Sequence, residues 1–177
     1  MKRFLIIATV LLWASAAFAQ EQAIPLRLEV AKIEDNSGNR ALELFNMPKD
    51  GADNYFLSVG HLGIGTDIVQ IEFDPIFELF IPLGSTVSEA LESMDRLLGY
   101  YDLDNGESVE ITGIFAPLLP TEPEETIKVT HRQVLLSNLL EFGMEKQGYV
   151  RANYVPKSRL RSLKSSLKFY SKLYPGK

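Results

Sequence analysis

The sequence of 177 residues contains no cysteine and only two histidines. Without a thiol the chain has no disulfide, no thiolate zinc site, no iron–sulfur cluster and no cysteine nucleophile, and lipid attachment through a cysteine is excluded. The composition is otherwise that of an ordinary globular protein, with 46% hydrophobic and 23% charged residues, so wholesale disorder is excluded too. The length suits a single domain, whose fold must depend on its core and its sheet alone.

Long apolar runs are absent except at the start of the chain. Residues 4–13 (FLIIATVLLW) follow two basic residues and precede small residues that include Ala17 and Ala19. This arrangement is typical of a secretory signal peptide over residues 1–19, whereas an N-terminal membrane anchor, the alternative, would need a longer run to cross a core of ~30 Å. We therefore expect a mature single domain over residues 20–177, periplasmic or extracellular, bacterial, and without a transmembrane helix.

Acidic residues are absent from the last part of the chain. Residues 146–177 hold 9 Lys and Arg and no acid, giving +9, whereas residues 20–145 hold 7 Lys and Arg against all 23 acids, giving −16. The formal net charge of −5 for the whole chain conceals this division. An acidic body with a basic tail is informative about partners rather than about the fold, and the negative balance argues against nucleic acid.

Alternation of apolar and polar residues, interrupted by turn residues, predicts a series of short strands. These occupy residues 24–33, 41–45, 55–59, 68–73, 76–81, 109–116, 126–130 and 149–155. Residues 87–98 instead repeat apolar side chains at helical spacing behind a capping box of Thr86 and Glu89, so a helix is expected there. Residues 131–146 fit either a helix or a strand that turns back at residues 146–148, and the hairpin is favoured.

A last helix is expected over about residues 158–173, with Ser158 as its N-cap. Many strands at short spacing and few helices predict an α+β fold. The sheet is expected to be mostly antiparallel, or a rolled barrel, with one central helix and a basic C-terminal helix.

The C-terminal helix has two different faces. An apolar stripe is formed by Leu160, Leu163, Leu167, Tyr170 and Tyr174, and the flanks and the other side carry Arg159, Arg161, Lys164, Lys168 and Lys172. Three interpretations are open. The stripe packs on the body and the cations are solvated, or the basic set contacts an anionic envelope surface, such as phospholipid, lipopolysaccharide or an acidic glycan, or the stripe binds a partner protein or a second copy.

Several other residues are candidates for chemistry. His61 and His131 lie outside any zinc or hydrolase motif, so each is expected to be an exposed or hydrogen-bonded structural histidine unless they meet on adjacent strands. The glycines of residues 60–65 depart from the order of a phosphate-binding loop, and a bulge or turn is expected there. The oxygen donors Asp102, Asp104, Asn105, Glu107 and Glu110 lack the glycine position of an EF-type calcium loop, so a solvated turn is expected.

Carboxylates also interleave with phenylalanines at Glu72, Asp74 and Glu78. They are expected to form the solvent-exposed face of a sheet whose other face is aromatic, with acid–base catalysis on a glycan as the alternative.

No catalytic constellation, cofactor motif or metal-ligand spacing emerges from these residues, so no cofactor is expected. We interpret the chain as an exported, non-enzymatic domain that binds a ligand, a partner or an envelope surface. The alternatives are a hydrolase with an unrecognised carboxylate or histidine site and a structural component of an envelope assembly. Deletion of residues 157–177 is expected to weaken association with the envelope and leave the body folded, whereas loss of the fold would support a packing role for the helix.

Overall fold

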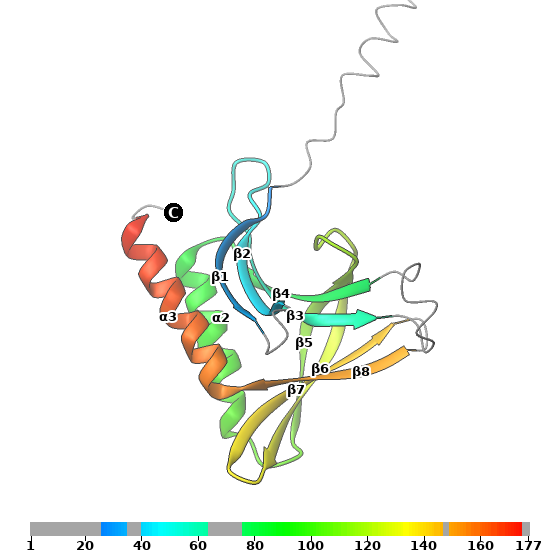
Figure 1. Cartoon of the computed structure of the whole chain (residues 1–177). Helices are drawn as coiled ribbons and strands as arrows, with labels where there is room; N and C mark the ends of the chain where they lie inside the picture. Colours follow the sequence, from blue (N-terminus) through cyan, green and yellow to red (C-terminus); the bar gives the residue numbers. More distant parts are fainter. Residues whose placement is uncertain (1–25, 35–39, 64–75, 147–148, 175–177) are drawn as a thin grey trace, which may run out of the picture.

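The computed structural model describes residues 26–34, 40–63, 76–146 and 149–174. Its eight strands form one sheet, in which the order of the strands is their order in the chain (Figure 1). In chain order the elements are β1 (Leu28–Glu34), β2 (Arg40–Asn46), β3 (Tyr55–Gly63), β4 (Ile76–Gly84), α2 (Val87–Gly99), the short 3-10 helix η1 (Tyr100–Asp102), β5 (Ser108–Ala116), β6 (Glu124–Val134), β7 (Ser137–Lys146), β8 (Tyr149–Pro156) and α3 (Lys157–Leu173).

Every ladder in the sheet is antiparallel. Within the described ranges no ladder joins β8 to β1, so the sheet is open rather than a closed barrel. It is nevertheless strongly curved, since β3 and β8 lie in contact although four strands separate them in the sheet. The α+β prediction is confirmed, with an open antiparallel sheet as its form.

The two helices pack against each other and lie together on one side of the sheet (Figure 1). Alternate residues of the strands point to them, including Leu44, Leu57 and Leu79, each fully buried. From the helices come Val87, Ala90, Met94 and Leu97 of α2 and Leu160, Leu163 and Leu167 of α3. Burial of one large apolar side chain contributes about 1.5–3 kcal/mol, so this layer is the main source of stability.

The opposite face of β2–β4 is also buried. Phe45, Phe56 and Phe80 lie there with Met47, Ile114 and Ala116 in a second apolar cluster. The ring of Phe45 stacks on Phe56 with centroids 5.6 Å apart and meets Phe80 edge-on at 5.8 Å. Because these strands are apolar on both faces, their sequences read as nearly continuous apolar runs rather than as clean alternation.

The start of α2 agrees with the sequence-based expectation. The hydroxyl of Thr86 accepts a hydrogen bond from the Glu89 amide at 3.1 Å, and the Glu89 carboxylate accepts from the Thr86 amide at 3.2 Å. The same carboxylate accepts from the amide and hydroxyl of Ser85, at 2.7 and 2.9 Å. These bonds, those from Ser85 first, hold the pKa of Glu89 below its usual value because they favour the charged form.

The later elements agree with expectation only in part. Residues 131–146 are strands, as favoured, but the chain already turns back once at Leu135 and Leu136, between β6 and β7. The prediction that Ser158 caps the last helix is wrong, because α3 begins at Lys157 and its N-cap is Pro156, which makes no side-chain capping bond. The strand expected at residues 68–73 lies outside the described residues.

Candidate functional site

The apolar stripe of α3 is largely buried. Leu160, Leu163 and Leu167 are between 0% and 1% exposed and belong to the main core, whereas Tyr170 is half-buried and Tyr174 is 51% exposed. The interpretation in which the stripe packs on the body is therefore confirmed for the three leucines. Docking of another protein through those leucines is contradicted, since they are not accessible.

Two basic residues of α3 face the body. Lys164 is 15% exposed and forms an ion pair with Asp95 of α2. It is therefore not available to contact an anionic surface, as the sequence analysis expected for the five cations of this helix. Lys157 binds Asp102 of η1 at 2.9 Å and lies 5.5 Å from the ring centroid of Tyr101. The hydrogen bond and the charge of Lys157 hold the pKa of Asp102 below its usual value. These contacts position α3 against α2 and η1.

The outer side of α3 combines cations with exposed apolar residues. Arg161, Lys168 and Lys172 are exposed, and Arg159 is half-buried. Phe169 and Leu173 are 62% and 57% exposed, and they line a pocket together with Glu29 and Val30 of β1. We call Arg161, Lys168, Phe169, Lys172 and Leu173 the outer face of α3. The sequence pattern locates the cations, but only the structure shows that an aromatic ring and a leucine are exposed among them.

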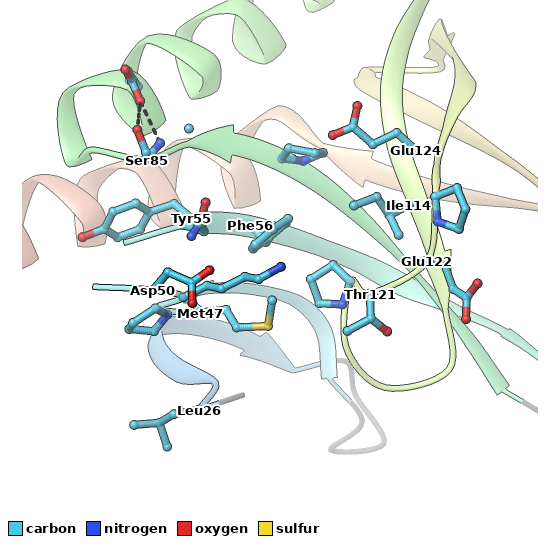
Figure 2. A pocket seen from close by; sticks show the side chains of 18 residues that line it. Leu26, Met47, Asp50, Tyr55, Phe56, Ser85, Ile114, Thr121, Glu122 and Glu124 are labelled. Carbon is cyan, nitrogen blue, oxygen red and sulfur yellow. Dashed lines mark hydrogen bonds between the residues drawn. The ribbon is translucent and has the colours of Figure 1, made fainter. Parts of the chain in front are cut away.

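A groove of about 1130 Å³ lies over the face of the sheet that is turned away from the helices and carries Phe56, and we call this the second face (Figure 2). Its walls are the turn between β2 and β3 and the connection between β5 and β6. Met47, Phe56 and Ile114 line its apolar floor and are 6%, 9% and 5% exposed. Its charged lining residues are Asp50, Glu89, Glu122 and Glu124 against Lys49, which makes the rim acidic.

The sequence pattern does not reveal this groove. Its floor combines Met47, which follows β2, with Phe56 of β3 and the distant Ile114 of β5. Its Pro- and acid-rich wall at residues 120–124 has the composition of an ordinary loop. The available signal is the combination of that acidic loop with apolar residues on both faces of β4.

An ion cluster lies beside the aromatic residues of the second face. The Arg27 guanidinium donates to Glu43 at 2.5 and 3.1 Å and to Glu78 at 3.2 and 3.3 Å. It lies 4.1 Å from the ring centroid of Phe45, and the Ser58 hydroxyl donates to Glu78 at 3.0 Å. Glu43 and Glu78 are each 3% exposed. The interpretation of Glu78 as part of a solvent-exposed face is therefore wrong, because its carboxylate is buried in a network of charge-assisted hydrogen bonds.

The other candidates for chemistry are scattered. His61 lies on β3 and His131 on β6, with β4 and β5 between them, so they are not on adjacent strands. His131 is 5% exposed, and neither of its ring nitrogens has a hydrogen-bond partner. The expectation of an exposed or hydrogen-bonded imidazole is therefore wrong for His131. Gly60 adopts a positive φ of 66° at a register shift in the β3–β4 ladder, which agrees with the bulge expected there. Glu72 and Asp74 lie outside the described residues.

The acidic segment after α2 is a hydrogen-bonded turn. The Glu107 carboxylate accepts from the amide of Asp104 at 3.0 Å, and the Asn105 side chain accepts from the amide of Gln133 at 2.8 Å. Asp104, Asn105 and Glu107 are exposed, as a solvated turn requires. In the part of the chain that the structure describes, no group of three or more His, Asp or Glu side chains is placed to hold a metal ion.

Comparison with known proteins gives no relative. No family model matches the chain, and no curated protein or solved structure is similar to it. Among the described residues, no helix has both the length and the apolar character needed to cross a membrane.

Proposed function

We propose that this protein is an exported, non-enzymatic domain that associates reversibly with an anionic phospholipid surface of the cell envelope through the outer face of α3. The observation that supports this proposal is the exposure of Phe169 and Leu173 on the same helix as the exposed cations of the outer face, while the three leucines of that helix are buried in the core. Such a helix lies in the plane of a membrane interface, with its apolar residues among the acyl chains and its cations at the headgroups.

The chemistry of this face favours lipid over the other anionic surfaces considered. A glycan or a lipopolysaccharide core offers hydroxyls and charges but little apolar volume, so Phe169 and Leu173 would stay in water. A phospholipid interface accepts both kinds of side chain. The three exposed cations would contribute about 1 kcal/mol each near such a surface, a weak attraction that matches reversible binding.

The charge distribution also fixes the orientation of the bound molecule. The body over residues 20–145 carries a formal charge of −16 and is repelled by an anionic surface. Only the basic C-terminal region is attracted, so the protein would approach with α3 first and its acidic groove would remain in solution.

Vesicle co-sedimentation of the mature chain tests the proposal. We expect binding to vesicles that contain phosphatidylglycerol and none to pure phosphatidylcholine, with binding lost at high salt, where the Debye length falls to about 3 Å at 1 M. The double variant Lys168→Glu/Lys172→Glu lowers the charge of this face by four units and should weaken binding by about 4 kcal/mol, beyond detection. Phe169→Gln/Leu173→Gln should weaken binding and leave the cations in place.

The matched control is Lys49→Glu/Lys128→Glu, which makes the same change in net charge at exposed positions away from α3. Equal losses in the control and in the α3 charge variant would show that only net charge matters, and would overturn the proposal. Binding to lipopolysaccharide or acidic glycan without binding to vesicles would also overturn it.

A further inference from the structure

The ladder between β4 and β5 is much shorter than its neighbours. The two strands pair only from Glu78 opposite Ala116 to Phe80 opposite Ile114. Beyond this point β4 continues to Gly84 alongside β3, and β5 runs back to Ser108 alongside β6. In the described part of the chain, residues 108–113 of β5 therefore have a strand partner on one edge alone.

The space between the diverging strands is hollow. A cavity of about 430 Å³ lies between residues 81–83 of β4 and residues 110–112 of β5, with α2 behind it. We call this space the wedge. It shares Pro82 and Glu124 with the large groove, so the wedge and the groove adjoin each other.

The two edges of the wedge differ in their availability. On the β4 side, the carbonyl of Leu83 already accepts a hydrogen bond from the Ser93 hydroxyl at 2.8 Å, and Pro82 has no amide hydrogen to donate. The β5 side carries no proline, and Glu110 and Thr112 are exposed there. Successive residues of a strand direct their backbone groups to opposite edges, so every second residue of 108–113 presents its amide and carbonyl to the wedge.

We propose that the wedge and groove together bind an extended, basic and apolar segment of another polypeptide, which adds to the free edge of β5 as an extra strand. Main-chain hydrogen bonds to residues 108–113 would hold it, as in other cases of strand addition. Six residues of strand span about 20 Å, long enough for a specific short ladder.

The surroundings select the composition of that segment. Glu110 and Glu124 line the wedge, where Arg96 of α2 is the one cation among the lining residues. Glu122 and Glu124 continue the acidic rim along the groove, so the net negative charge favours lysine or arginine in the segment. Where the segment enters the groove, Met47, Phe56 and Ile114 offer an apolar floor for its alternate side chains. An acidic or fully polar strand would meet repulsion at the rim and would leave the floor unfilled.

The test uses the mature chain and a short fluorescein-labelled peptide in which lysine and valine alternate. We expect saturable binding, and amide exchange followed by NMR should slow at least tenfold at alternate residues of 108–113 when the peptide is present. The amides of the same segment that bond to β6 should already exchange slowly without it. A peptide with proline in place of valine should not bind, since it cannot form the ladder.

The double variant Glu110→Lys/Glu124→Lys should raise the dissociation constant at least tenfold. Its control, Glu92→Lys/Glu145→Lys, makes the same charge change at exposed positions of α2 and β7 and should leave the constant within twofold. Binding of the peptide without protection of the β5 amides would overturn the proposal of strand addition. Equal effects of the two double variants on the dissociation constant would overturn the proposal that the peptide binds at the wedge and groove. Self-association of the chain through the same amides would replace the proposed occupant with a second copy.

Discussion

At the scale of single residues, the tip of the β6–β7 hairpin departs most from what its sequence suggests. Val134 pairs with Ser137, so Leu135 and Leu136 form a two-residue loop. Leu135 adopts a φ of 53°, and the two leucines are 93% and 103% exposed. Such loops usually hold Asn or Gly, because a side chain at positive φ costs roughly 1–2 kcal/mol.

Leu135→Gly should therefore stabilise the protein by about 0.5–1 kcal/mol, since the strain that glycine relieves exceeds the cost of the freer unfolded chain and little buried contact is lost. The measurement is the free energy of unfolding in urea. Leu136→Gly is the matched control, because Leu136 is equally exposed but has no positive φ. The control should lose about 0.5–1 kcal/mol through the greater freedom of the unfolded chain. A loss of stability in both variants would contradict the interpretation that the positive φ strains the backbone at Leu135.

At the scale of elements, local signals predict α2 correctly, whereas the reversal of the chain at residues 135–136 has no such signal. The capping box and the 3–4 spacing define α2 because both act within a few residues. The leucine pairs at residues 135–136 and 139–140 imitate helical spacing, and no Gly or Asn marks the turn, so the sequence leaves helix and strand open. The start of α3 is displaced for a similar reason. Pro156, with φ −70° and ψ 143°, leads directly from β8 into the helix, and Ser158 is already inside it.

The candidate sites are predictable only in part. The cations of α3 follow one another in the sequence, so their common face can be foreseen. The ion cluster around Arg27 joins residues 16 and 51 positions apart, and the groove joins segments of several strands. Such proximity depends on the register and curvature of the whole sheet, which no local pattern reports.

The packing of α3 yields a prediction for the element as a whole. Leu163 is 1% exposed, so Leu163→Ala should lower the free energy of unfolding by about 3 kcal/mol. Phe169→Ala on the outer face of the same helix is the control and should change it by less than about 0.5 kcal/mol. Both are measured by urea unfolding. A large loss for Phe169→Ala would show that its ring supports the fold, and the outer face would not be free to bind lipid.

The same packing changes the meaning of the deletion of residues 157–177. Because α3 supplies three leucines to the main core, the deletion is expected to unfold the protein. It therefore cannot separate binding from stability, whereas substitutions on the outer face can.

At the scale of the whole molecule, charge and shape divide the protein in the same way. Lys157 and Lys164 tie the basic helix to acidic residues of the body, at Asp102 and Asp95. Lys168 and Lys172 form no ion pair within the described residues, and they lie on the side of α3 away from the core. The groove, with its acidic rim, lies over the other face of the sheet. The two proposed interactions thus use surfaces of opposite charge that need not compete.

The curvature that separates these surfaces depends on the contact between β3 and β8. Gly60 of β3 has a φ of 66°, and a Cβ atom there would lie 1.9 Å from the side-chain nitrogen of Asn153 on β8. Gly60→Ala should therefore lower the free energy of unfolding by about 1–3 kcal/mol through backbone strain, with the clash in addition.

Gly99→Ala is the control, since Gly99 is the last residue of α2, has a φ of −64°, and a Cβ atom added there would meet nothing within 4 Å. This variant should gain up to about 1 kcal/mol. Adding Asn153→Ala to Gly60→Ala should recover the part of the loss that comes from the clash. Urea unfolding measures all three, and a Gly60→Ala variant as stable as the parent would show that the close approach of β3 to β8 does not constrain the curved sheet.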